Sequence, residues 1–311
     1  MSQNQMQTKI VIEKKRDSQL YCVLYAIVAK IPQITQESVV MAAPLPNLPV
    51  GPINKPFLRR RFSYEILIVL GLSLGASAVY SVVNLVARLT ADTQLAGQTA
   101  TINGSLSDRD WLELSYQLLA IFFGLMPVVL VFYLVALFPG HPFKRLGFDL
   151  SSPTKDVGRG LFLVLIIGVP GLALYGAGRA LGLTVNVVPA PLDVFWWTIP
   201  VLILSALRSA LTEELIVVGY LFDRLRQLGW RTWTIIFSTA ALRASYHLYQ
   251  GIGPFFGNLA MGVVFGWFYT RWGRTMPLVI AHWIIDIVSF VGYAWAVSVW
   301  PDFFRLPASS S

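Results

Sequence analysis

Two adjacent glutamates, Glu213 and Glu214, lie inside an apolar stretch of the chain. Between residues 194 and 222 the only other charged side chain is Arg208. An ionisable side chain at bilayer depth costs at least about 2.5–3.5 kcal/mol on insertion scales, so it is rare without a partner or a chemical role. Because neighbouring residues point about 100° apart around a helix, we expect one carboxylate to face a central site and the other to face a neighbouring helix.

Two further apolar stretches each contain an ionisable pair with helical spacing. Arg243 and His247 are four residues apart, and so are His282 and Asp286. This spacing places the members of a pair on one helix face, where the carboxylate of Asp286 can fix the ring orientation or tautomer of His282. A lone histidine in a helix is more often a hydrogen-bonded packing residue. Ionisable groups on three separate apolar stretches, however, favour a functional site inside a helix bundle.

A carboxylate and two histidines that face one another in a dry site can activate water. The glutamate takes a proton from the water, one histidine orients it, and the second histidine stabilises the oxyanion of a tetrahedral intermediate. Alternatively, His247, His282 and Glu213 hold a zinc ion and leave its fourth position open. Along their predicted helices His282 lies about 9 Å and His247 about 22 Å from the inner end. The two histidines therefore meet only if the helices are tilted, staggered or end elsewhere.

The composition is that of a polytopic membrane protein. Of the 311 residues 55% are hydrophobic and 13% are charged, and the mean hydropathy is +0.62, which excludes an ordinary soluble domain. The formal net charge is +8, and we attribute this excess to membrane topology and attraction to anionic lipids, not to nucleic-acid binding. The single cysteine, Cys22, excludes an intrachain disulfide and a cysteine-based metal site.

The predicted fold class is all-α, a polytopic membrane bundle of about seven, at most eight, transmembrane helices. An apolar run needs about 20 residues to span the hydrocarbon core. The loops between such runs alternate in their content of Lys and Arg, which places the N-terminus in the cytoplasm. The fourth run is long enough to be tilted or broken. The predicted spans are residues 62–89, 111–138, 160–183, 194–222, 232–250, 255–270 and 276–300.

The chain divides by composition into four parts. Near its start, charged residues followed by a short apolar run at residues 20–29 resemble a signal peptide. We favour instead an extension ahead of a true start at Met41, or a flexible tail. The four parts are a cytoplasmic N-terminal extension and linker (1–61), the first two transmembrane helices (62–145), a core that carries the ionisable residues (146–300) and a C-terminal tail (301–311).

Taken in order on successive spans, these residues resemble the three motifs of the CPBP (CAAX protease and bacteriocin-processing) intramembrane proteases, the Rce1-like or Abi proteins. The resemblance covers about residues 146–300, is strongest from 212 to 286, and is to the bacterial branch of the family. As a set the motifs are fairly specific, although each alone is not. The matching residues are Glu213-Glu214, His247 and His282-x-x-x-Asp286.

Two positions depart from the family motifs. The first motif, EExxxR, has Val218 where arginine is expected, and the second, FxxxH, has Arg243 where phenylalanine is expected. The motif arginine would neutralise Glu214 from one helical turn away. We interpret the two departures together: Arg243 supplies, from the next helix, the cation that is lost at Val218.

The resemblance implies an intramembrane endopeptidase that hydrolyses a peptide bond of a membrane-associated protein or peptide. In that mechanism Glu213 and His247 activate the water, His282 and the Asp286 position bind the oxyanion, and Glu214 completes the catalytic set. The family often has asparagine at the last position. Asp286 can donate a hydrogen bond only if it is protonated, and when ionised it would instead orient His282.

The resemblance leaves the cofactor and the substrate open. The family is described both as metalloproteases and as metal-free glutamate proteases; we expect no required cofactor, with zinc as the alternative. The expected partners are membrane lipids and a peptide or membrane-anchored protein, such as a prenylated CaaX tail or a bacteriocin-type peptide, in the plasma (inner) membrane of a bacterium. Two other functions stay open: a non-catalytic immunity or scaffold protein, which the missing motif arginine favours, and a proton-coupled transporter, because membrane carboxylates and histidines also build proton relays.

Overall fold

The structure is a computed structural model that describes residues 56–101, 103–188 and 195–299. The chain divides into two units, residues 1–48 and 49–311, and all described residues belong to the second. The predictions made for residues 1–55 and for the C-terminal tail therefore fall outside the described residues.

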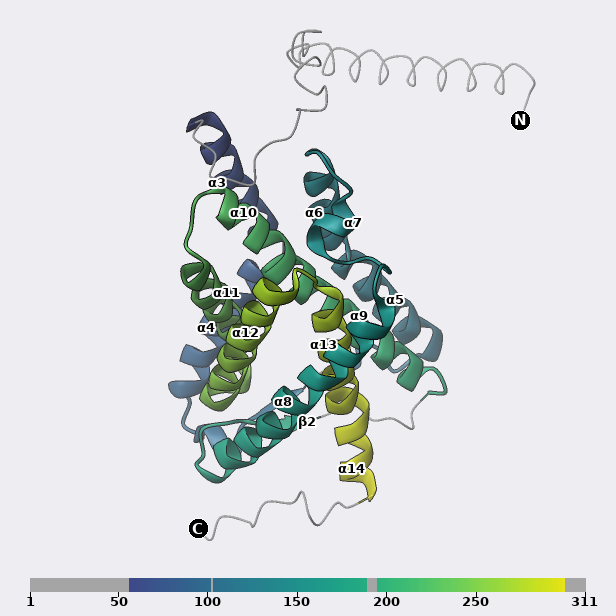
Figure 1. Cartoon of the computed structure of the whole chain (residues 1–311). Coiled ribbons are helices and arrows are strands. Elements are labelled where there is room, and N and C mark those ends of the chain that lie inside the picture. The colour runs from purple at the N-terminus through teal and green to yellow at the C-terminus, as the bar shows by residue number, and fades with distance from the viewer. Residues whose placement is uncertain (1–55, 102, 189–194, 300–311) are drawn as a thin grey trace, which may run out of the picture. The chain divides into compact units, whose positions relative to one another are not determined.

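The described part is built from helices, which confirms the all-α prediction (Figure 1). Its β-structure is one parallel pair of three-residue strands, β1 (Thr99–Thr101) and β2 (Asn186–Val188), and an isolated antiparallel bridge between Thr184 and Gly251. The α-helices are α3 (Pro56–Gly71), α4 (Leu74–Leu89), α5 (Asp110–Gly124), α6 (Met126–Ala136), α7 (Pro142–Leu146), α8 (Pro153–Ala180), α9 (Thr198–Glu213), α10 (Leu221–Gln227), α11 (Thr232–Tyr246), α12 (Ile252–Trp272), α13 (Met276–Ile287) and α14 (Tyr293–Val299).

Four described helical segments are long and apolar enough to cross a membrane, and α3 with α4 makes a fifth if this pair, bent by 56°, counts as one span. The predicted number of seven is not confirmed. The predicted fifth span contains α11, which has only 15 residues, fewer than the roughly 20 that a span needs. In the predicted fourth span, α9 continues without a break as a π-helical segment and then as α10. The four segments are Asp110–Ala136, Pro153–Gly178, Ile252–Trp272 and Met276–Ala296.

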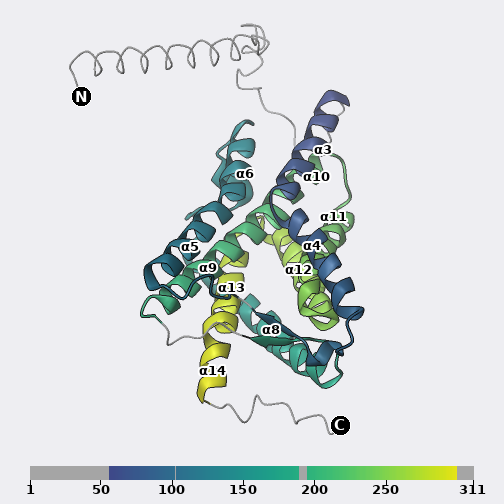
Figure 2. The same ribbon diagram turned by 180° about the vertical axis from the view of Figure 1, so that it is seen from behind.

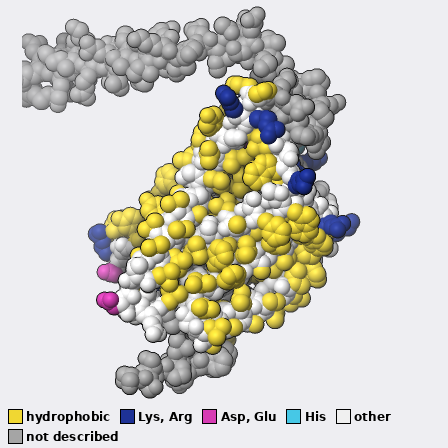
Figure 3. All heavy atoms as spheres, turned by 90° about the vertical axis from the view of Figure 1, so that its left-hand side faces the viewer, with side chains coloured by type: hydrophobic (Ala, Val, Ile, Leu, Met, Phe, Trp, Pro, Cys, Tyr) yellow, Lys and Arg dark blue, Asp and Glu magenta, His cyan; other side chains and the backbone are white. Residues whose placement is uncertain are grey.

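Apolar side chains cover much of the face shown in Figure 3, while basic side chains gather towards its upper part. Large hydrophobic residues are exposed on several helices, among them Leu67, Val79, Phe122, Leu165 and Trp233. Such an apolar exterior would be unfavourable in water and suits contact with lipid. The exposed residues and the long apolar helices together show an integral membrane protein.

The helix from α9 to α10 is the core element that carries the two glutamates. Between the two α-helices, residues Glu214–Tyr220 form a π-helical segment in which every residue is buried. α9 packs beside α13, and α11 packs beside α12, as both ribbon views show (Figures 1 and 2). Gly262 permits the second contact, because a Cβ there would lie 2.7 Å from the Cα of Ala240.

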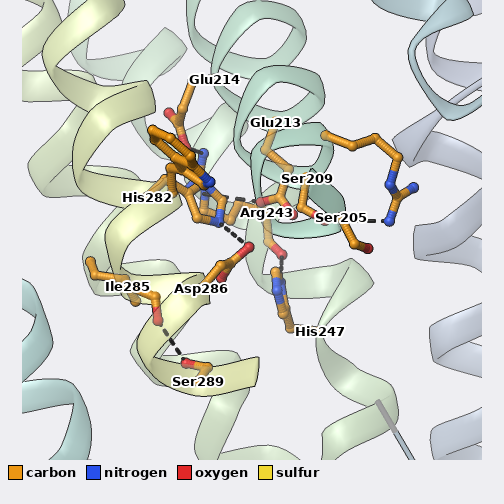
Figure 4. A network of polar contacts seen from close by, with 12 residues as sticks. Ser205, Ser209, Glu213, Glu214, Arg243, His247, His282, Ile285, Asp286 and Ser289 are labelled. Atoms are coloured by element: carbon orange, nitrogen blue, oxygen red, sulfur yellow. Dashed lines mark hydrogen bonds and ion pairs between the residues drawn. The ribbon is translucent and has the colours of Figure 1, made fainter. Parts of the chain in front are cut away.

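The end of α11 determines where His247 lies along its helix relative to His282. The predicted span to residue 250 stops as an α-helix at Tyr246, and a 3-10 turn, Leu248–Gln250, leads to Gly251. Gly251 has φ = 106°, a conformation that favours glycine, and it starts α12. His247 thus caps the far end of α11, whereas His282 lies near the middle of α13. Both histidines nevertheless belong to one site, as Figure 4 shows.

A buried ionic cluster that the sequence analysis did not identify joins α3 and α6 to α10. Arg224 Nε lies 2.6 Å from Glu65 Oε1, Nη1 lies 2.8 Å from Asp223 Oδ2, and Nη2 donates to the carbonyl oxygen of Leu134 at 2.9 Å. The Tyr220 hydroxyl donates to the same oxygen of Glu65 at 3.0 Å. We call Glu65, Tyr220, Asp223 and Arg224 the Glu65 cluster.

Candidate active site

The two glutamates lie where α9 changes into the π-helical segment. Glu213 is the last residue of α9, and Glu214 is the first residue of the segment Glu214–Tyr220. π-Helical turns are rare and are found mostly at functional sites. The two carboxylates leave the helix in different directions, as Figure 4 shows. The expectation that they face different neighbours is therefore met by the geometry.

Glu214 is fully buried and joins two other helices. Its Oε1 atom lies 2.5 Å from Nη2 of Arg243 on α11 and 2.7 Å from Nδ1 of His282 on α13. Its side chain has 0% of its surface exposed, and so has that of Arg243. A carboxylate that is sealed in this way cannot reach a substrate. It is placed to hold the ring of His282 and to neutralise the cation of α11.

Glu213 is held at one oxygen only. Its Oε2 atom accepts a hydrogen bond of 2.7 Å from the hydroxyl of Tyr246 and lies 4.0 Å from Nη1 of Arg243. In contrast to Glu214, its side chain keeps 11% of its surface exposed. The other carboxylate oxygen, Oε1, is therefore the one that is open to a reactant.

Tyr246 was not identified from the sequence. Its ring is 5% exposed and packs beside the ring of His247, with 4.8 Å between the ring centroids. The only sequence signal for Tyr246 is its position directly before His247. That signal is weak, because membrane helices contain many tyrosines as interfacial residues.

His282 lies between two carboxylates, as the four-residue spacing to Asp286 predicted in part. Its Nε2 atom is 3.6 Å from Oδ2 of Asp286, which is too long for a direct hydrogen bond. The shorter contact is the one to Glu214 on the other ring nitrogen. The Asp286 side chain keeps 17% of its surface exposed, so it lies at the accessible side of the ring.

His247 is oriented by the backbone of its own helix. Its Nδ1 atom lies 3.1 Å from the carbonyl oxygen of Arg243. Because a carbonyl only accepts, this bond places the proton on Nδ1 and leaves Nε2 as a proton acceptor. The ring lies close enough to Glu213 and His282 for electrostatic interaction, and Figure 4 shows it beneath Glu213.

The predicted zinc ligands do not converge on one point. Among residues 56–101, 103–188 and 195–299, no three side chains of His, Cys, Asp or Glu are placed to hold one metal ion. This arrangement does not fit a site with His247, His282 and Glu213 as ligands.

Two further residues complete the surroundings of the site. Val218, where the family motif has arginine, is 2% exposed and lies inside the π-helical segment. Arg243 provides the cation that contacts Glu214, as the joint reading of the two motif departures predicted. Arg208, on α9, interacts electrostatically with Glu213 and Asp286 but forms no ion pair with either.

Comparison with known proteins identifies the segment that holds these residues. A family model described as type II CAAX prenyl endopeptidase Rce1-like matches residues 195–288. No curated protein and no solved structure matches the chain. The matched segment runs from the start of α9 to the end of α13 and contains all the motif residues. The part of the chain that carries the site is thus similar to the Rce1-like family of type II CAAX prenyl endopeptidases.

Proposed function

We propose that the protein is an intramembrane endopeptidase in which Glu213 acts as the general base towards water. The observation that carries this proposal is the difference between the two glutamates. Glu214 is sealed against Arg243 and His282, whereas Glu213 is bonded at one oxygen and partly exposed at the other. A carboxylate with one oxygen fixed and one oxygen open is arranged to take a proton in a defined direction.

The geometry supports the following order of steps. Oε1 of Glu213 takes a proton from a water molecule that Nε2 of His247 orients, and the water oxygen attacks the peptide carbonyl carbon. The negative charge that forms on the carbonyl oxygen is stabilised beside His282 and Asp286. Glu213 then returns the proton to the leaving nitrogen as the C–N bond breaks. Glu214 takes no part in bond formation and holds His282 in place.

We propose further that hydrolysis needs no metal ion. The placement of the side chains supports this, because no three side chains of His, Cys, Asp or Glu among the described residues are placed to hold one metal ion. The proposed substrate is a membrane-anchored protein or a peptide. The basic loops favour a cytoplasmic N-terminal side in a bacterial plasma membrane.

The test compares cleavage of a broad pool of membrane-anchored peptides by the wild type and by Glu213→Gln. Loss of a general base lowers the rate by about 100- to 10,000-fold, so we expect no measurable cleavage by the variant. Glu113→Gln is a matched control, because Glu113 is also buried, at 3% exposure, but binds the backbone amides of Leu106 and Ser107 at the start of α5. Cleavage by Glu213→Gln at the wild-type rate would refute the proposal.

The competing function is a non-catalytic immunity or scaffold protein of the same family. Val218 in place of the motif arginine favours it. The contact between Arg243 and Glu214 weakens that support, because it restores a cation at the buried carboxylate. A cellular phenotype that survives in Glu213→Gln would select the non-catalytic function.

A further inference from the structure

Four aromatic side chains join the start of α8 to the end of α12. The ring centroids of Phe162, on α8, and Phe268, on α12, are 5.9 Å apart. The ring of Phe268 also lies 4.7 Å from that of Trp267 and 4.4 Å from that of Trp272. None of the four side chains is fully buried, and Phe162 keeps 48% of its surface exposed. We call these four residues the aromatic cluster; it borders the exterior of the bundle, where the protein meets lipid.

Two arginines lie over rings of the aromatic cluster. Cζ of Arg159, on α8, is 4.9 Å from the centroid of Trp272, and Cζ of Arg271, in the last turn of α12, is 5.3 Å from that of Trp267. An aromatic face attracts a cation and so orients the guanidinium. It does not use up the five N–H donors as a carboxylate would. The donors of both arginines are therefore available to an anionic ligand.

Neither arginine forms an ion pair within residues 56–101, 103–188 and 195–299. Asp156, one turn before Arg159, is fully buried, and both of its oxygens accept hydrogen bonds from Arg274. Lys155 adds a further positive charge one turn from Arg159. The charges of Arg159 and Arg271 are therefore not neutralised by this part of the protein. Its ion-paired arginines are Arg145, Arg224, Arg243 and Arg274.

We propose that Arg159 and Arg271 bind the phosphate of an anionic phospholipid whose acyl chains lie against the aromatic cluster. This inference does not depend on the proposed protease function. A guanidinium binds two oxygens of a phosphate through parallel hydrogen bonds. Basic sites between membrane helices suit anionic lipid headgroups, and the exposed rings supply apolar surface for the first carbons of the chains.

The positions of the two arginines along their helices match the depth of a headgroup. The apolar segment Pro153–Gly178 has 26 residues, or about 39 Å of helix, whereas the hydrocarbon core is about 30 Å thick. Arg159 lies about 9 Å from the start of this segment, a few ångströms inside the edge of the core. A long basic side chain reaches the headgroups from there. Arg271 is the last but one residue of the segment Ile252–Trp272.

Charge complementarity favours a lipid over a second copy of this chain. The helix ends on this side are tied together by ion pairs from Arg145 to Asp223 and from Arg274 to Asp149 and Asp156. These three carboxylates are thus already paired within their own chain and are not free to bind the arginines of another copy. Two chains with a formal net charge of +8 also repel each other.

The experiment measures lipid binding to the full-length protein in detergent micelles by native mass spectrometry. The probes are phosphatidylglycerol, which is anionic, and phosphatidylcholine, whose phosphate is offset by its own cation. We expect the wild type to bind phosphatidylglycerol about 10- to 30-fold more tightly, the range for two basic side chains at a membrane surface. This ratio should fall as salt is added. In the double variant Arg159→Gln/Arg271→Gln it should be near one.

Two single variants are matched controls. Arg109→Gln removes an arginine that also lies over a ring, 5.7 Å from the centroid of Trp111, but at the opposite end of the segment Asp110–Ala136 from the loop that leads to α8. Arg231→Gln removes an exposed cation from the loop after α10, the helix whose Asp223 pairs with Arg145, and so on the same side as the aromatic cluster. Both controls should keep the wild-type ratio.

A second double variant separates binding geometry from charge and from folding. Arg159→Lys/Arg271→Lys keeps both charges but loses the planar fork, so its ratio should lie between those of the wild type and of the glutamine variant. Both arginines are at least partly exposed, so we expect all variants to unfold at the wild-type temperature. A lysine variant that unfolds like the wild type and has the full wild-type ratio would show that no guanidinium site exists.

The remaining outcomes decide between a site, a charged surface and a protein interface. Equal binding of the two lipids by the wild type overturns the inference, and so does a preference that survives in Arg159→Gln/Arg271→Gln. If Arg231→Gln lowered the ratio as much as Arg271→Gln, general attraction would explain the binding and the site would be refuted. A dimer that only the wild type forms, without lipid preference, would assign the surface to a second copy. None of these results involves cleavage, so each leaves the proposed protease function untouched.

Discussion

The protein contains two buried clusters with the same three residue types, a glutamate, an arginine and a tyrosine. In the Glu65 cluster, Arg224 and the hydroxyl of Tyr220 both contact Glu65. In the second cluster, which we call the site cluster, Arg243 contacts Glu214 and the hydroxyl of Tyr246 contacts Glu213. Each cluster joins helices that are far apart in the sequence. Residue type alone therefore does not distinguish the two clusters.

The Glu65 cluster and the site cluster differ in how many of their polar groups have hydrogen-bond partners. All three nitrogens of Arg224 have partners, and the guanidinium also lies over the rings of Phe62 and Phe138 at 4.8 and 4.7 Å. In the site cluster, Nε and Nη1 of Arg243 have no hydrogen-bond partner among the described residues, and neither has Oε2 of Glu214.

The comparison separates a structural cluster from a functional one. A fully satisfied buried network fixes the packing of helices. A network that leaves buried groups without hydrogen-bond partners is less favourable for folding, and such features are concentrated at functional sites. We therefore assign the Glu65 cluster to stability and the site cluster to chemistry.

The largest expected effect is that of removing either arginine. Loss of one partner of a buried ion pair costs about 3–5 kcal/mol of folding free energy, so Arg224→Ala and Arg243→Ala should both lower the thermal unfolding temperature in detergent. Only Arg243→Ala should also abolish cleavage per folded molecule, because His282 loses the orientation that Glu214 gives it. If Arg224→Ala lost activity per folded molecule to the same extent, the assignment of the two clusters would be wrong.

The second prediction concerns moving the arginine that pairs with Glu214 from position 243 to position 218. Adding Val218→Arg to Arg243→Ala should restore part of the lost stability, because an arginine one helical turn from Glu214 can pair with it. Residues that share one partner typically show coupling energies of about 0.5–3 kcal/mol. A double-mutant cycle measured by thermal unfolding gives this energy. Additive effects of the two substitutions would show that Arg243 does not stand in for the motif arginine.

The sequence predicted the chemical groups of the site but not their connections. The ionisable residues on three apolar stretches could be found because charge is rare at membrane depth. The partner of Glu214 could be inferred from two departures from a motif. The bond from Tyr246 to Glu213 could not, since tyrosine is common in membrane helices and the two residues are 33 positions apart. The catalytic roles of these residues stay predictions.

The fold was predictable in class and less so in detail. The apolar content identified a helical membrane protein, yet the predicted number of seven spans is not confirmed, because α11 is shorter than the apolar run that contains it. The π-helical segment 214–220 could not be predicted, because the residues that follow Glu214 in it are an ordinary apolar helical sequence. The pairing of Glu65 with Arg224 spans 159 positions and depends on which helices pack together.

The third prediction removes one hydroxyl from each cluster. Tyr246→Phe should lower kcat by about tenfold or more with little change in KM, because Glu213 loses the bond that directs its open oxygen to water. Tyr220→Phe is the matched control: it removes a hydroxyl bond to a buried glutamate and should cost about 0.5–1.5 kcal/mol of stability with unchanged kcat. Steady-state kinetics and thermal unfolding of both variants decide the matter. Equal effects on kcat would mean that Tyr246 serves only to stabilise the fold.

The smallest effect is expected from removal of metal ions. This experiment tests whether the site cluster, like the Glu65 cluster, is held together by protein side chains alone. No three side chains of His, Cys, Asp or Glu among the described residues are placed to hold one metal ion, so a chelator should leave the cleavage rate unchanged. Purified protein should contain less than one zinc ion per chain. Stoichiometric zinc that is lost in both His247→Ala and His282→Ala, together with inhibition by the chelator, would show that the histidines rearrange to bind metal. The two clusters would then share only their residue types, because the site cluster would need zinc to activate water, the role assigned here to Glu213.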